Sequence, residues 1–67
     1  MDLGLSARVG LARMNKNRSW LAKQLNVTSA YAGQICNGVI EPSTPMLNDL
    51  SRIFKVDVSV FISWGER

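Results

Sequence analysis

The stretch that most constrains the fold of this chain is residues 18–37. Its apolar residues recur at helical spacing in two short segments, about 18–25 and 29–37, so each segment has one inward stripe. Between them, Asn26 readily adopts the left-handed conformation that ends a helix. Thr28 can then cap the next helix through its side-chain oxygen. The stretch therefore predicts two short helices joined by a tight turn.

This helix pair has two interpretations. Any small helical domain contains pairs of amphipathic helices, so the two stripes alone indicate little about function. Ala22 is small at the point where the two helices must cross closely. Together with Asn26 and Thr28, it forms a pattern that is typical of a helix-turn-helix unit. In such a unit the second helix enters the major groove of DNA.

Length and composition exclude several classes of protein. Sixty-seven residues allow one domain with one core, which we expect to span residues 1–67. One cysteine excludes an internal disulfide, and the lack of histidine argues against a zinc site. We expect no metal, no cofactor and no small-molecule ligand. An enzyme is not expected either, because the chain has no carboxylate pair at useful spacing and no nucleophile with a base.

The sequence also indicates a cytoplasmic protein with no membrane partner. No apolar run approaches the roughly 20 residues that span a bilayer. Asp2, Gly4 and Arg8 interrupt the N-terminal stretch, which is therefore not a signal peptide.

The positive charge is concentrated in the half that contains the predicted helix pair. The net charge is +3; residues 1–40 carry +4 and residues 41–67 carry −1. The basic residues of the first half are Arg8, Arg13, Lys16, Arg18 and Lys23. Such a distribution suits a surface that meets phosphates, although a small excess of charge is also common on ordinary surfaces.

Residues 2–15 form the first predicted helix, which has apolar residues on two nearly opposite faces. One face holds Leu3, Ala7, Leu11 and Met14; the other holds Leu5, Val9 and Ala12. Either this helix is wedged between the helix-turn-helix and a C-terminal helix, which we favour, or its second face binds a partner.

The second half of the chain predicts two more helices, giving an all-α fold of about five helices. Ser43 or Thr44 caps the fourth helix, whose inward residues are Leu47, Leu50, Ile53 and Phe54, with Asn48, Asp49, Ser51 and Arg52 outside. Asp57 caps a short fifth helix with more apolar groups than a small core can bury. We therefore expect a dimer interface at Val58, Val60, Phe61 and Trp64.

Gly33 lies in the middle of the third predicted helix. A glycine there weakens the helix by ~1 kcal/mol relative to alanine. Two interpretations are equally open. Without a side chain, the backbone can approach DNA or another helix closely, or nothing at this position selects against glycine.

Together these residues resemble the family of lambdoid phage repressors and Cro proteins, which includes bacterial xenobiotic-response-element-type regulators. The similarity covers nearly the whole chain and implies a five-helix, lambda-repressor-like DNA-binding domain. It rests on Leu21-Ala22, Val27-Thr28, Ile35 with Asn37-Gly38, Pro42-Ser43 and the closing run at 56–62.

The resemblance implies roles for individual residues. The positions that read bases in the family correspond to Ser29, Ala30 and Gln34. The positions near the DNA backbone correspond to Lys16, Asn17, Arg18, Thr28, Tyr31 and Asn37, with Arg13 and Lys23 as longer-range phosphate contacts.

The sequence departs from the family pattern at two places. Many members have a buried Arg–Glu pair at positions that here hold Leu11 and Cys36, so we expect both residues to be in the core. The loop after the third helix is usually basic, whereas Val39, Ile40 and Glu41 are apolar and acidic here.

We therefore expect a transcriptional regulator, a Cro-like phage or prophage repressor that binds an inverted-repeat operator in double-stranded DNA as a homodimer. A restriction–modification controller or an antitoxin would use the same chemistry. The alternative is a protein-interaction module, such as an antirepressor, that keeps the fold and binds a protein partner through Val39 and Ile40.

Overall fold

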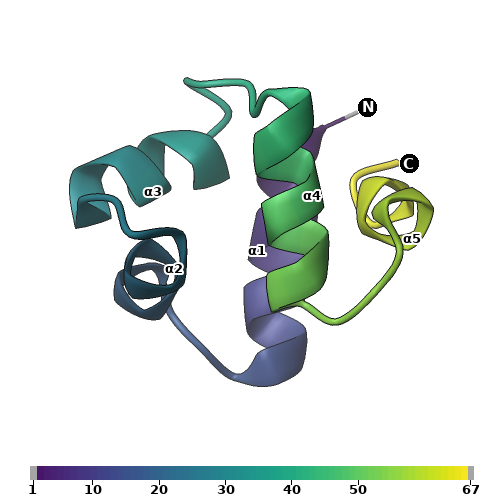
Figure 1. The fold of residues 1–67 in the computed structure, drawn as a ribbon, viewed down its shortest axis with the longest axis horizontal. Helices are drawn as coiled ribbons and strands as arrows, with labels where there is room; N and C mark the ends of the chain where they lie inside the picture. The colour runs from purple at the N-terminus through teal and green to yellow at the C-terminus, as the bar shows by residue number, and fades with distance from the viewer. Residues whose placement is uncertain (1, 67) are drawn as a thin grey trace.

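The computed structural model describes residues 2–66, which form five helices and no strand, as the sequence predicts. Residues 1 and 67, the ends of the predicted domain, lie outside the described residues. The helices are α1 (Leu3–Met14), α2 (Arg18–Leu25), α3 (Ser29–Cys36), α4 (Thr44–Ile53) and α5 (Val58–Ser63) (Figure 1).

Side-chain caps fix where the first three helices begin. Asp2, Asn17 and Thr28 each accept a hydrogen bond from the backbone N–H three residues further on, at 2.9–3.1 Å. Each bond satisfies one of the amides that a helix leaves without a partner at its N-terminus. Ser43 and Asp57 occupy the cap positions of α4 and α5, but their side chains make no cap hydrogen bond.

Residues with left-handed backbone follow each of the first three helices. Asn15 follows α1 with a φ of 55°, and Asn26 follows α2 with a φ of 59°. Gly38 has a φ of 78° two residues after the end of α3. The turn predicted from Asn26 and Thr28 is therefore confirmed, and it sets the crossing of α2 and α3.

α1 lies between α3 and α5, as the wedge interpretation predicts. Its contacts nevertheless come from one broad face. Ser6 and Gly10 are buried there, whereas Leu5 and Val9 remain half-buried and Ala12 is exposed. The second apolar face of α1 is thus not the surface that wedges the helix in place.

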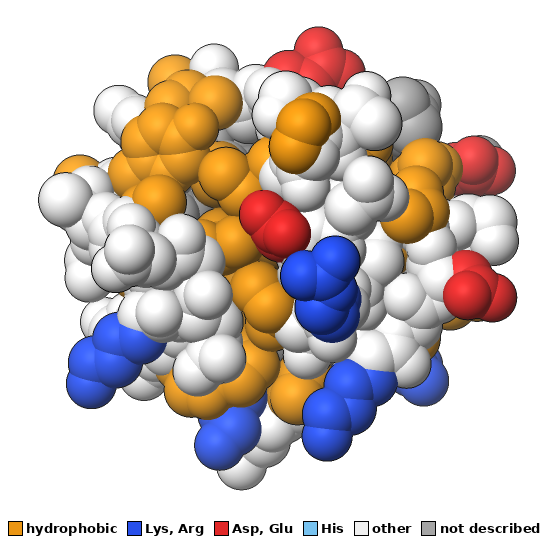
Figure 2. All heavy atoms as spheres, viewed as in Figure 1, with side chains coloured by type: hydrophobic (Ala, Val, Ile, Leu, Met, Phe, Trp, Pro, Cys, Tyr) orange, Lys and Arg blue, Asp and Glu red, His pale blue; other side chains and the backbone are white. Residues whose placement is uncertain are grey.

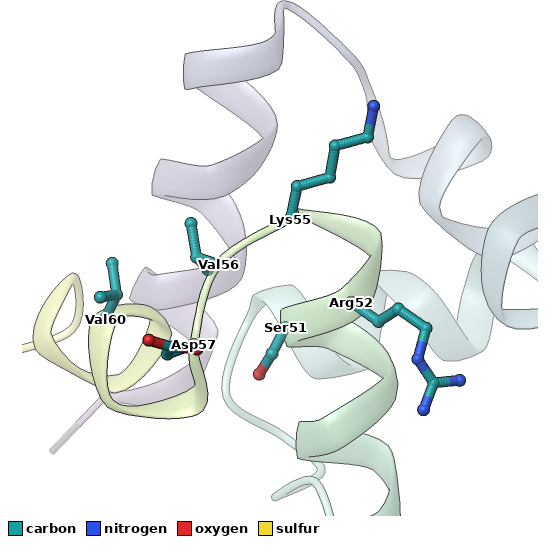
Figure 3. Close-up of a pocket in the computed structure, with 6 residues that line it drawn as sticks. All are labelled: Ser51, Arg52, Lys55, Val56, Asp57 and Val60. Atoms are coloured by element: carbon teal, nitrogen blue, oxygen red, sulfur yellow. The ribbon is translucent and has the colours of Figure 1, made fainter.

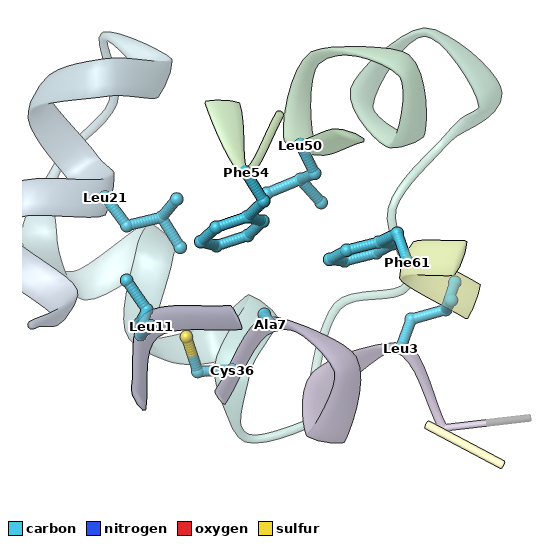
Figure 4. Packing of buried hydrophobic residues seen from close by; sticks show 8 residues of the cluster. All are labelled: Leu3, Ala7, Leu11, Leu21, Cys36, Leu50, Phe54 and Phe61. Atoms are coloured by element: carbon cyan, nitrogen blue, oxygen red, sulfur yellow. The ribbon is translucent and has the colours of Figure 1, made fainter. Parts of the chain in front are cut away.

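Each of the five helical segments contributes to one core (Figure 4). Its buried members are Leu3, Ala7, Leu11, Leu21, Cys36, Leu50, Phe54 and Phe61. The prediction that Phe61 lies at a dimer interface is wrong, because this side chain is 0% exposed within the single chain. Its ring stacks on Phe54, with centroids 5.8 Å apart, and meets Trp64 edge to face at 6.1 Å.

The predicted position of Ser51 is also wrong. The sequence places it on the outer face of α4, but the residue is buried. Its hydroxyl donates a hydrogen bond of 2.7 Å to the carbonyl oxygen of Leu47, one turn earlier in the helix. A small hydroxyl that bonds its own helix can be buried at little cost.

Candidate nucleic-acid interface

α3 packs against α2 and α1 and presents its other side to solvent at the edge of the molecule (Figure 1). Its buried residues are Ala32, Gly33, Ile35 and Cys36. The three residues matched to base-reading positions, Ser29, Ala30 and Gln34, are all exposed. The chain therefore leaves the outer side of α3 uncovered, which is the condition for a helix to enter the major groove.

Two residues that cap helices near this face keep side-chain hydrogen-bond donors that can bind a ligand. Asn17 and Thr28 use their side-chain oxygens to accept amides of their own helices. The Asn17 amide nitrogen and the Thr28 hydroxyl hydrogen remain available as donors. The first backbone N–H groups of a helix also favour an anion. The starts of α2 and α3 can thus each bind a phosphate.

The remaining residues matched to the DNA backbone are also accessible at least in part. Lys16, Arg18 and Asn37 are exposed, and Tyr31 is half-buried. The Lys16 Nζ lies 5.7 Å from the centroid of the Trp20 ring, which itself packs on the core. Trp20 therefore supports the position of a basic side chain near the start of α2.

Arg13 has an aromatic neighbour of its own. The sequence adds it as a longer-range phosphate contact, but its guanidinium carbon lies 5.2 Å from the centroid of the Trp64 ring. Trp64 follows directly after α5, which is on the other side of α1 from α3. Stacking on an aromatic face explains this position of the arginine.

Charged side chains are unevenly distributed over the surface. On the face in Figure 2, Lys and Arg side chains gather along the lower edge, whereas Asp and Glu side chains lie mainly at the upper and right edges. The lower left of this view is the region of α2. Positive side chains next to α2 provide charge that attracts a phosphate backbone, whereas α3 lies above them in this view.

Leu11 and Cys36, at the positions of the family's charged pair, are both buried in the core, as expected (Figure 4). Burial raises the pKa of the Cys36 thiol, while the positive charges of Arg18 and Arg8 act in the opposite direction. A thiol with a raised pKa is a poor nucleophile. Cys36 therefore acts as a packing residue between α1 and α3.

At α5, the residues predicted to form a dimer interface are accessible to different extents. Val60 is 40% exposed, and Val58 and Trp64 are half-buried. Val60 also lines an open hollow between the end of α4 and α5 (Figure 3). The other residues of this hollow are Ser51, Arg52, Lys55, Val56 and Asp57.

The loop between α3 and α4 carries the most exposed large apolar side chain of the described residues. Val39 is 71% exposed, and the adjacent Ile40 is half-buried. Glu41 is exposed beside them, so the loop offers no basic group to a phosphate.

An uncovered α3 held across α2 by a capped turn defines a helix-turn-helix protein. The profile of the helix-turn-helix family matches residues 9–61, which is most of the chain. The chain belongs to the Cro/C1-type helix-turn-helix family, whose members are DNA-binding transcription regulators and typically not enzymes. No curated protein and no solved structure matches it significantly.

Two further findings concern residues 2–66. They contain no group of three His, Cys, Asp or Glu side chains arranged to hold a metal ion. None of the helices in this range has the length and apolar character needed to cross a bilayer.

Proposed function

We propose that this chain is a Cro-like repressor, from a phage or prophage, that binds an inverted-repeat operator as a homodimer in the cytoplasm of a bacterial host. The observation that carries the proposal is the uncovered outer side of α3, on which Ser29, Ala30 and Gln34 are exposed.

Gln34 is the main base-reading residue of the proposal. A primary amide can donate to N7 of adenine and accept from its N6–H at the same time. This bidentate pair discriminates against other bases by ~1–3 kcal/mol. Ser29 can bond a base edge, and Ala30 can contact a thymine methyl group.

The DNA backbone is bound by the residues around the two helix starts and the end of α3. They are Lys16, Asn17, Arg18, Thr28, Tyr31 and Asn37. Contacts to phosphates fix the register of α3 on the duplex without reading sequence. The acidic and apolar loop after α3 removes one basic contact, so non-specific affinity should be lower than for a repressor with a basic loop.

Dimerisation follows from the small size of the reading surface. One recognition helix buries too little surface for specific affinity near ~10 nM. Two copies related by a two-fold axis would place their α3 helices on half-sites about 34 Å apart. The accessible apolar residues after α4 are Val58, Val60 and Trp64, and we assign the contact between copies to them.

Selection of bound oligonucleotides from a random pool tests the proposal directly. We expect a recovered site with two-fold symmetry, and binding that weakens steeply as salt is raised. In Gln34→Ala, the preference at one adenine position per half-site should be lost, while the salt dependence stays the same. A selection that recovers no sequence preference would contradict the proposal.

A second candidate function rests on the exposed loop. Val39 is 71% exposed and Glu41 lies beside it, which suits a protein surface better than a phosphate. An antirepressor or antitoxin-like protein would keep the fold and bind a partner protein here. Tight binding to such a partner, without any salt-dependent binding to DNA, would favour this candidate.

A further inference from the structure

Gly33 lies in the middle of α3 and is buried. Its backbone does not require glycine, because Gly38 is the only glycine among residues 2–66 with a positive φ. The reason for glycine at this position is space. A Cβ atom added to Gly33 would lie 2.9 Å from both Cδ and Nη1 of Arg18. The Arg18 side chain thus lies against the α3 backbone where any other residue has a side chain.

Arg18 is otherwise free to bind an anion. Within the part of the chain that the structure describes, the one ion pair joins Arg52 to Asp49. The positive charge of Arg18 also opposes the rise in the pKa of Cys36, one turn further along α3 from Gly33. The distances at Gly33 place the guanidinium against α3, and among residues 2–66 no carboxylate forms an ion pair with it.

We propose that Gly33 is a positioning residue, whose missing side chain provides a seat that holds the Arg18 guanidinium against α3 as a preorganised phosphate-binding group. The inference rests on the proposed function, because the phosphate is that of the DNA backbone. It goes further by explaining why the recognition helix contains a glycine.

Preorganisation matters because a free arginine side chain must lose much rotational freedom when it binds. Its planar guanidinium can donate two parallel hydrogen bonds to a phosphate only in a defined orientation. A guanidinium already held on α3 needs little further ordering when the helix enters the groove.

The test compares Gly33→Ala, Arg18→Ala and the double variant in thermal unfolding and operator binding. Arg18 has a flexible, exposed side chain, so the new Cβ displaces it without disturbing the core. Because alanine is the better helix former, Tm of Gly33→Ala should rise by roughly 4–8 °C. Its operator affinity should nevertheless fall by about tenfold, which a merely structural role would not produce.

Arg18→Ala should weaken binding by a similar factor and lower the salt slope by about 1. The double variant should bind no more weakly than Arg18→Ala alone. Arg52→Ala is the matched control, because it also removes one exposed arginine, from α4, and should bind normally. Gly33→Ala with unchanged affinity, or losses that add in the double variant, would overturn the inference.

A measurement without DNA separates this inference from the proposed function. In the free protein, ¹⁵N relaxation of the Nε–H groups should show Arg18 to be more ordered than Arg52, and Gly33→Ala should abolish the difference. Equal mobility of the two side chains would show that Gly33 does not hold the Arg18 guanidinium against α3. Failure of the wild-type chain to bind any DNA, with Arg18 ordered, would refute the proposed function and with it the role of Arg18 in phosphate binding.

Discussion

Leu11 and Cys36 are neighbours in the core at positions where the family resemblance implies a charged pair. An apolar pair avoids the cost of taking two charges out of water, whereas one unpaired charge at such a position costs about 3–5 kcal/mol. The two residues must therefore be exchanged together.

Leu11→Arg and Cys36→Glu should each destabilise the fold strongly, and the double variant should be more stable than either single variant. Urea unfolding followed by circular dichroism measures the three free energies. The physical reason is that each new charge neutralises the other only when both are present. A double variant less stable than both single variants would contradict a direct contact between these positions.

The Cys36 thiol also makes stability depend on pH. Burial raises the pKa of Cys36, so in alkaline solution the unfolded chain loses the thiol proton before the folded chain does. The unfolded state then binds fewer protons, and stability falls as pH rises. The loss should begin above about pH 8.5, the ordinary range of a thiol.

Cys36→Ala is the control for this effect. Unfolding free energies at pH 7 and pH 9.5 should differ more for the wild type than for Cys36→Ala, since other groups that titrate in this range are common to both. An equal pH dependence in the two proteins would show that the thiol does not ionise differently on unfolding.

At the scale of the helix, the residue that departs most from local preference is Lys55. It follows α4 with a φ of 60°, in the left-handed region, where Asn15 and Asn26 are better suited residues. Lys55→Gly should therefore stabilise the fold by about 0.5–1 kcal/mol, since relief of the strain outweighs the entropy that glycine loses. Thermal unfolding measures the gain. Lys55→Ala keeps the Cβ and should give none.

Local signals are what made the helices predictable. Asn26 and Thr28 act on the backbone close to them in the chain, so their roles follow from sequence alone, and α2 begins and ends as predicted. The burial of Phe61, by contrast, depends on residues that are distant in the sequence. Its burial is decided by the stacking of Phe54, from the end of another helix, and spacing within α5 could not reveal it.

The same distinction applies to the candidate site. The exposure of Gln34 follows from its position on α3 opposite Ala32 and Ile35. The contact of Arg18 with Gly33 depends on how closely α2 and α3 cross. The sequence shows that a glycine inside a helix is unusual. Only the crossing of α2 and α3 in the structure shows that the Arg18 side chain fills the space beside Gly33.

At the scale of the molecule, the proposed homodimer needs an accessible apolar surface that joins two copies. Phe61 is excluded by its burial, which leaves Val60 as the most exposed apolar residue of α5. A carboxylate placed there would face solvent in the single chain but would lose its hydration between two copies, which is costly. Val60→Asp should therefore leave the fold intact and break the dimer.

Val39→Asp is the matched control, because Val39 is even more exposed, at 71%, and lies in the loop after α3. Sedimentation should show Val60→Asp as a monomer at concentrations where the wild type and Val39→Asp are dimers. Its binding to a full operator should weaken toward that of a half-site, since the second copy no longer adds its contacts. If instead Val39→Asp dissociates the dimer and Val60→Asp does not, the loop joins the copies and the proposed arrangement on the operator is wrong.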